Sequence, residues 1–238
     1  MAKSQPQDRD SFCKKIFSTI ATRYDFFNTV LSLNRDKYWR RFTVNMTGLK
    51  PGDRALDVCC GTGRICMEQA NLVGPTGKVI GLDFCRDMLA IASRDIKAAK
   101  LDNIIDLVEG NAHDLPFSDN TFDGVTIGFG LRNVADIRGV LAELRRVVRP
   151  GARVVSLDLA KPGIIGFKQL YNFYLEQFVP FLGRMGVGQD TPYRWLPESL
   201  KIFPHQSEIC TMFSDAGLKE TIYYELTGGI VAVHVGVK

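Results

Sequence analysis

The chain has 238 residues, of which 45% are hydrophobic, 24% charged and 10% aromatic. This composition excludes a disordered chain, a collagen-like repeat and a small disulfide-stabilised protein, and the length is sufficient for a substantial core. The net charge is only +4, but residues 1–54 carry 11 lysines and arginines against 5 acidic residues. This excess indicates either an anionic partner, such as a membrane surface, a nucleic acid or an acidic substrate, or a solvated helical face.

An amino-terminal helical cap is predicted over residues 1–50. Apolar side chains recur at helical spacing from Phe12 to Ile20 and again from Trp39 to Met46. No stretch of about 18 uninterrupted apolar residues occurs, and the first ten residues lack the apolar core of a secretory signal. We therefore expect a cytoplasmic protein whose six cysteines are reduced.

Strand-like and helix-like segments alternate between residues 51 and 160. This alternation predicts a doubly wound α/β fold, Rossmann-like, with a mostly parallel sheet and helices on both faces. Asp87 is expected to cap the helix that follows the second strand. The expected strands are 54–59, 78–83, 104–109, 122–129 and 152–158, and the clearest helices are 87–100 and 137–148.

Two later segments depart from this alternation. Residues 161–210 are rich in aromatic side chains at helical spacing, which indicates either core packing or a dimer face, or an insertion that covers a substrate cleft. Residues 211–238 contain two strand-like runs joined by Thr227–Gly229, a connection too short for a parallel crossover. We therefore predict an antiparallel hairpin that completes a seven-stranded sheet in a single domain, 1–238.

The sharpest motif, LDVCCGTG at residues 56–63, joins the first strand to the first helix. Its glycines allow a ligand to approach the backbone closely at the carboxyl edge of the sheet. Asp83 ends the second strand, where a carboxylate suits the hydroxyls of a ribose. The third glycine of an NAD-binding turn would fall at Cys66, so S-adenosylmethionine fits better than a dinucleotide. The predicted residues of this turn and its partner acid are Asp57, Gly61, Thr62, Gly63 and Asp83.

A third segment, GNAHDLPF at residues 110–117, offers polar groups to an adenine edge. With this segment, residues 54–160 resemble a class I S-adenosylmethionine-dependent methyltransferase. Rarer runs extend the likeness over nearly the whole chain. They are RYD at 23–25, GFGLRNV at 128–134, YRWL at 193–196 and LTGGIVAVH at 226–234. Together these runs resemble the ubiquinone/menaquinone biosynthesis C-methyltransferase family.

This resemblance implies C-methylation of a polyprenylated quinol, either demethylmenaquinol or the methoxylated benzoquinol of the ubiquinone pathway. Another lipid-like acceptor, or a cofactor-binding regulator without activity, are the alternatives. Position 128 commonly carries serine in the family, so glycine leaves only backbone for that contact. The implied cofactor contacts are Thr62, Asp83, Asn111, Ala112 and Gly128.

Methyl transfer to a ring carbon needs a stabilised phenolate, so a cation near the acceptor is expected. Arg132 is the candidate, with Asn133 for the second ring oxygen and Tyr24 and Asp25 closing over the ring. Alternatively, Arg132 pairs with an acid at the sheet edge, and Tyr24 and Asp25 form a structural pair at a helix end. We expect no metal and no nucleic acid, peripheral contact at the inner face of a membrane, and leave a homodimer open.

Overall fold

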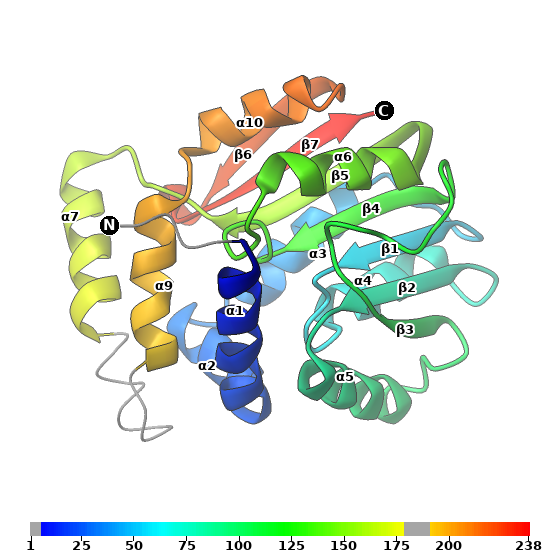
Figure 1. Ribbon diagram of the computed structural model, residues 1–238, viewed down its shortest axis with the longest axis horizontal. Helices are drawn as coiled ribbons and strands as arrows, with labels where there is room; N and C mark the ends of the chain where they lie inside the picture. Colours follow the sequence, from blue (N-terminus) through cyan, green and yellow to red (C-terminus); the bar gives the residue numbers. More distant parts are fainter. Residues whose placement is uncertain (1–5, 179–190) are drawn as a thin grey trace.

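A seven-stranded sheet in the order β3-β2-β1-β4-β5-β7-β6 organises the fold (Figure 1). The computed structural model describes residues 6–178 and 191–238. Strands β1 to β5 are parallel, whereas β7 runs antiparallel to both β5 and β6. The strands are β1 (Arg54–Val58), β2 (Lys78–Asp83), β3 (Ile105–Glu109), β4 (Phe122–Gly128), β5 (Val148–Leu159), β6 (Lys219–Leu226) and β7 (Val231–Val237).

Helices cover both faces of this sheet because each strand buries side chains on both of its sides. One face packs against α3, α4 and α5, and the other against α6 and α10. The alternating βα order also places the carboxyl ends of β1, β2, β3 and β4 at one edge of the sheet. The covering helices are α3 (Asp36–Met46), α4 (Arg64–Val73), α5 (Arg86–Ala98), α6 (Ile137–Val147) and α10 (Gln206–Asp215).

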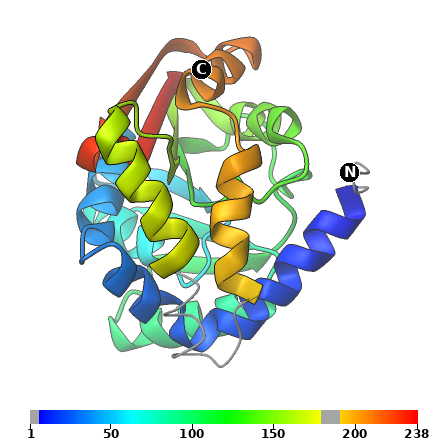
Figure 2. The ribbon, with the colours of Figure 1, turned by 90° about the vertical axis from the view of Figure 1, so that its left-hand side faces the viewer.

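Four further helices gather at that edge, as the turned view shows (Figure 2). They pack through a separate apolar cluster that includes Ile16, Phe27, Tyr171 and Leu200. The cluster joins the amino-terminal cap to the insertion, although about 140 residues separate them in the sequence. These helices are α1 (Pro6–Ile20), α2 (Tyr24–Leu31), α7 (Ile165–Phe173), which continues as a π-helical turn (Tyr174–Phe178), and α9 (Thr191–Ile202).

The predicted fold class is confirmed, including the seven strands and the antiparallel carboxyl-terminal pair. Two details were wrong. Cys85, not Asp87, is the N-cap of α5, because the chain turns directly after Asp83. Strand β5 starts at Val148, before the Pro150–Gly151 break, because Val148 pairs with Phe122 across an irregularity in the sheet.

Two predicted features fall partly outside the residues that the structure describes. The insertion predicted at 161–210 includes residues 179–190, and the cap predicted at 1–50 includes residues 1–5; neither stretch is described. Within the described ranges, no helix combines the length and apolarity needed to cross a membrane.

Candidate active site

The glycine turn between β1 and α4 is fastened to the end of β2 by Asp83. Gly61 and Gly63 both have positive φ, 54° and 75°, a backbone conformation that favours glycine. The amide of Gly61 donates to Asp83 Oδ2 at 2.8 Å, and the amide of Cys85 donates to Oδ1 at 2.9 Å. Burial raises the pKa of Asp83, and these amides partly offset that effect. Each carboxylate oxygen still has a lone pair for a ligand hydroxyl.

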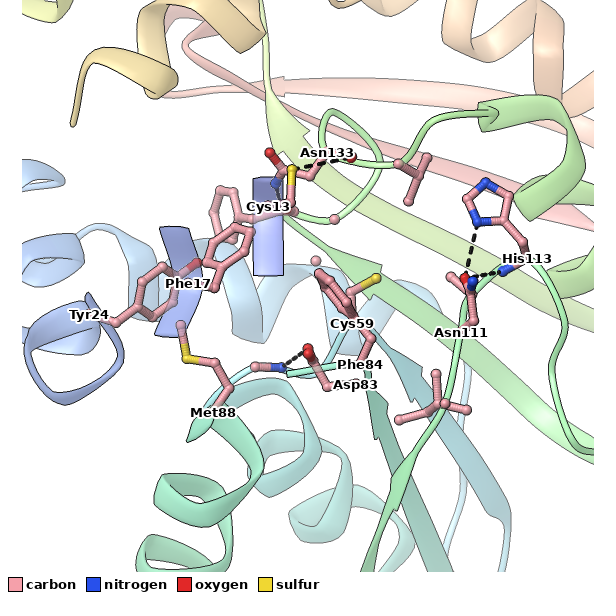
Figure 3. Close-up of a pocket in the computed structure, with 18 residues that line it drawn as sticks. Cys13, Phe17, Tyr24, Cys59, Asp83, Phe84, Met88, Asn111, His113 and Asn133 are labelled. Carbon is pink, nitrogen blue, oxygen red and sulfur yellow. Dashed lines mark hydrogen bonds between the residues drawn. The ribbon is translucent and has the colours of Figure 1, made fainter. Parts of the chain in front are cut away.

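A pocket opens beside this turn, at the carboxyl ends of β1 to β4 (Figure 3). Five of the eight predicted cofactor residues line it, namely Gly61, Asp83, Asn111, Ala112 and Gly128. Sequence reasoning missed the lining that comes from elsewhere in the chain, including Cys13 and Phe17 of α1 and Phe84 and Met88 beyond β2. No short-range motif marks α1 as part of this pocket.

The other three predicted cofactor residues, Asp57, Thr62 and Gly63, do not line the pocket. Asp57 is buried beneath the turn, where it accepts hydrogen bonds from Thr126 Oγ1 at 2.6 Å and Cys66 Sγ at 3.5 Å. Burial in this apolar layer raises the pKa of Asp57 to about 7. Asp57 therefore supports the turn from its buried side, whereas Thr62 and Gly63 form part of the turn itself.

Backbone strain is concentrated at two non-glycine residues of the pocket wall. Cys59 has φ of 57° and Phe129 has φ of 56°, which is uncommon for residues with a side chain. The two turns pack closely, since a Cβ at Gly130 would lie 2.9 Å from the Cβ of Cys59. Such strain persists only when the surroundings impose it, and it is typical of functional sites.

Gly128 brings bare backbone to the pocket wall. A Cβ at this position would lie 2.2 Å from Ile65 Cδ1, which comes from the first turn of α4. The side chain of Ile65 is itself buried. Ile65 therefore occupies the space that a side chain at position 128 would need.

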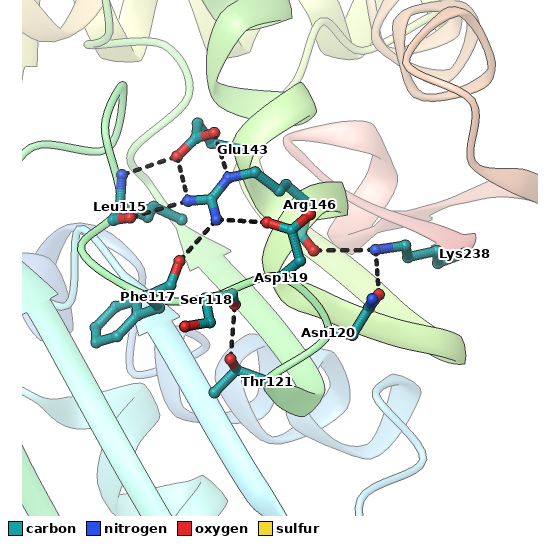
Figure 4. A network of polar contacts seen from close by, with 9 residues as sticks. All are labelled: Leu115, Phe117, Ser118, Asp119, Asn120, Thr121, Glu143, Arg146 and Lys238. Atoms are coloured by element: carbon teal, nitrogen blue, oxygen red, sulfur yellow. Dashed lines mark hydrogen bonds and ion pairs between the residues drawn. The ribbon is translucent and has the colours of Figure 1, made fainter.

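An arginine network holds the loop that follows β3 against α6 (Figure 4). Arg146 donates to the carbonyl oxygens of Leu115 and Phe117 at 2.9 and 2.7 Å. Glu143 pairs with Arg146 and accepts the amide of Leu115 at 2.9 Å. The hydrogen bond from Arg146 lowers the pKa of Glu143. This network fixes the loop whose first residues, Asn111 and Ala112, line the pocket.

A second and larger cavity, of about 740 Å³, lies between the cap and the insertion. Its walls are mostly apolar and come from α1, α2, α3, α7 and α9. Phe17, Tyr24 and Phe129 line both this cavity and the smaller pocket, so the two spaces meet there. The aromatic residues Phe167, Tyr171 and Tyr174 of the insertion, together with Leu170, belong to its wall.

Arg132 lies in the wall of the apolar cavity and is paired with Asp158 of β5. Its Nη1 donates to Asp158 Oδ1, and its backbone amide donates to Oδ2 at 3.1 Å. Burial lowers the pKa of Arg132, but Asp158, Tyr24 and Tyr171 together raise it above the ordinary value of an arginine. Arg132 Nε is buried and has no hydrogen-bond partner among the described residues. The pairing expected as the structural alternative therefore exists, and it leaves the Nε donor without a partner.

The other three predicted catalytic residues lie in different surroundings. Tyr24 is at the junction of the two spaces, and burial raises the pKa of its hydroxyl. Asn133 lines only the smaller pocket, and its amide donates to Phe129 O at 3.0 Å and accepts from Trp195 Nε1 at 2.9 Å. Asp25 lines neither space, because its carboxylate binds Thr62 Oγ1 and Arg64 Nε, both at 2.8 Å.

Comparison with known proteins decides the family. The model of the ubiE/COQ5 methyltransferase family matches residues 3–238. The chain belongs to this family. It is therefore an S-adenosylmethionine-dependent methyltransferase.

Relatives of this methyltransferase are similar over its whole length. It is 44% identical over 232 residues to demethylmenaquinone methyltransferases of Bacillus cytotoxicus and Bacillus mycoides, covering 98% of this chain and 98% of each relative. Among solved structures, a SAM-dependent methyltransferase from Aquifex aeolicus superposes with a TM-score of 0.65 at 21% identity, covering 89% of this chain and 96% of that one. This structural likeness supports the fold.

Proposed function

We propose that this methyltransferase converts demethylmenaquinol to menaquinol by methylating a ring carbon of the reduced, prenylated naphthoquinone. The observation that carries the proposal is the junction of the two spaces at Phe17, Tyr24 and Phe129. There a smaller pocket that carries polar groups such as Asp83 and Asn111 meets an apolar cavity of about 740 Å³, which suits an isoprenoid chain. The relatives are demethylmenaquinone methyltransferases, which agrees with this acceptor.

The residues of the smaller pocket fit S-adenosylmethionine. The Asp83 carboxylate lies at the carboxyl end of β2, and the Asn111 amide lies just beyond the carboxyl end of β3. Together they offer hydrogen-bond acceptors and donors to a ligand in the pocket. Gly128 lets backbone reach the ligand without an intervening side chain. S-adenosylmethionine held by these residues would supply an electrophilic methyl group.

Arg132 is proposed to stabilise the negative charge that develops on the ring oxygen next to the acceptor carbon. An unperturbed phenol ionises near pH ~10, so a fixed cation is needed to favour the phenolate at neutral pH. Asp158 holds the guanidinium in place in the wall of the cavity, and the charge of the guanidinium favours the phenolate. A tyrosine ionises near pH ~10 and burial raises the pKa of Tyr24 further, so its hydroxyl is protonated at pH 7 and can donate to the same oxygen.

Asn133 and Asp25 are proposed as positioning residues. Asn133 joins the Phe129 turn to Trp195 of the insertion, so it orders the wall through which the two spaces meet. Asp25 joins the start of α2 to Thr62 and Arg64 at the glycine turn. In these roles they hold the cap and the insertion against the cofactor domain.

We also propose that the cavity mouth contacts the inner face of a membrane, where a polyprenylated substrate resides. Val30, Leu33 and Leu170 line the cavity and are 41%, 86% and 64% exposed. Arg35, beside them, supplies positive charge. Leu33→Ser should reduce sedimentation with anionic vesicles without changing cofactor affinity. If the wild type sedimented equally with vesicles of any lipid charge and at any salt concentration, this proposal would be contradicted.

The role of Arg132 is tested by Arg132→Ala and Arg132→Lys, with Arg138→Lys as the matched control. Arg138 is an exposed arginine that pairs with Asp215, and neither residue lines either space. Loss of one preorganised donor lowers turnover by about 10²–10³, so both Arg132 variants should lose turnover of reduced demethylmenaquinone. Cofactor affinity from calorimetry should stay within a fewfold of the wild type. Normal turnover by both variants would remove Arg132 from the mechanism.

A further inference from the structure

A second buried ion pair lines the apolar cavity, separate from that of Arg132. On α3, Arg40 Nη1 donates to Asp36 Oδ2 at 2.6 Å. The two side chains are only 9% and 4% exposed, and both residues line the cavity. Asp36 Oδ1 also accepts the hydroxyl of Ser32 at 3.1 Å. The proposed reaction, as derived from Arg132 and Tyr24, makes no use of this pair.

Both carboxylate oxygens of Asp36 accept hydrogen bonds, whereas Arg40 has more N–H donors than partners. A guanidinium has five N–H donors, and within the described residues Arg40 donates a hydrogen bond only to Asp36. Burying two charges costs free energy that their mutual attraction seldom repays without further hydrogen bonds. The remaining donors of Arg40 are therefore available to an oxygen of a ligand in the cavity.

Arg40 and Arg132 both line the apolar cavity. Both guanidinium groups act electrostatically on the hydroxyl of Tyr24, which lies where the cavity meets the smaller pocket. Asn133, which the sequence suggested for the second ring oxygen, lines only the smaller pocket, and Phe129 and Trp195 engage its amide. A cation on the cavity side replaces it as the candidate for that oxygen.

We propose that Arg40, held by Asp36, binds the second oxygen of the substrate ring, the one para to the oxygen at Arg132. The inference rests on the proposed function and adds to it a selection for aromatic rings with two opposed oxygens. A ring gripped at both oxygens can expose only one edge to the smaller pocket. The pair Asp36–Arg40 therefore orients the ring and leaves the prenyl chain in the apolar part of the cavity.

The test compares two acceptors with Arg40→Gln. The first is a short-chain prenylated naphthalene-1,4-diol, and the second is the same ring without the hydroxyl para to the activated one. Arg41→Gln is the matched control, because Arg41 is the next residue of α3 and its side chain is 69% exposed. Arg40→Gln should lower kcat/KM for the diol by roughly 10- to 100-fold, the range of a lost hydrogen bond to a charged group. For the single-hydroxyl ring it should change kcat/KM less than threefold.

Thermal unfolding and cofactor titration accompany the kinetics. If Arg40→Gln does not fold, Arg40→Lys, which keeps the charge beside Asp36 but loses the planar fork, takes its place and should narrow the preference for the diol. Equal losses on both acceptors would show that Arg40 acts only through the fold, and would overturn the inference. Wild-type enzyme that binds the cofactor but methylates neither ring would instead overturn the proposed function, and the inference with it.

Discussion

The contact between Gly128 and Ile65 makes a quantitative prediction about the cofactor pocket. Gly128→Ala adds a Cβ that would lie 2.2 Å from Ile65 Cδ1, far inside van der Waals contact. The next nearest atom, Ile65 Cγ1, would be 3.7 Å away, which is an ordinary separation. The clash therefore involves a single methyl group, and removing that methyl should relieve it.

The magnitude follows from overpacking. Forcing one extra carbon into a packed core costs roughly 1–3 kcal/mol, so Gly128→Ala alone should lower the free energy of unfolding by about that amount. Ile65→Val deletes Cδ1 and should cost about 0.5–1.5 kcal/mol on its own. The double variant should be more stable than the sum of the single effects predicts, with a coupling of about 1–2 kcal/mol.

Urea unfolding of the four proteins measures this coupling, and calorimetric titration with the cofactor gives the affinity of each. Gly128→Ala should also weaken cofactor binding, and Ile65→Val should restore it in the double variant. Additive effects on stability would refute the packing argument, because they would mean that the two positions do not touch. Loss of binding that Ile65→Val fails to restore would show that the ligand itself needs the space above Gly128.

Three other outcomes are expected. Asp83→Ala should weaken cofactor binding by about 1–3 kcal/mol in calorimetry, through lost hydrogen bonds to a charged group and the freed glycine turn; unchanged affinity in a folded variant would exclude Asp83 from the site. Burial lowers the pKa of His234 to about 4, below the ~6.5 of an unfolded histidine. Protonation of His234 therefore favours the unfolded state. The free energy of unfolding in urea should be highest above pH 6.5 and fall by up to about 3 kcal/mol as the pH falls toward 4. His234→Gln should make the free energy of unfolding less dependent on pH in this range. An unaltered pH dependence would contradict the lowered pKa of His234. Arg146→Met should loosen the loop after β3, seen as faster amide exchange at Leu115 and several-fold weaker cofactor binding; unchanged exchange would mean that Glu143 alone holds the loop.

The sheet could be predicted from the sequence because its signals are local. Strands β2, β3 and β4 are short runs that end at an aspartate, a glutamate and a glycine, and α6 carries a clear apolar face. The glycine turn and Asp83 also follow from local spacing. The start of β5 could not be predicted, because Val148 is drawn into the sheet by pairing with Phe122, a partner 26 residues away.

The apolar cavity could not be predicted, because no single segment contains it. Its walls come from α1, α2, α3, α7 and α9. For the aromatic residues of the insertion, helical spacing alone was equally consistent with core packing and with a cover over a substrate cleft. The pairing of Arg132 with Asp158 was foreseen only as an alternative, since the two residues lie on separate strand ends. Arg40 was not predicted as a site residue, because an arginine on a helix is ordinarily a surface residue.

Transfer of an isotopically labelled methyl group tests the central claim most directly. The wild-type protein is mixed with S-adenosylmethionine labelled with carbon-13 in its methyl group and with chemically reduced demethylmenaquinone. The reduced benzoquinone of the ubiquinone pathway and a phospholipid amine serve as competing acceptors. The account predicts a new methyl signal on a ring carbon of the naphthoquinol, at a rate that falls about 10²–10³-fold in Arg132→Ala. Label on an oxygen or a nitrogen, or faster transfer to either competing acceptor, would contradict it.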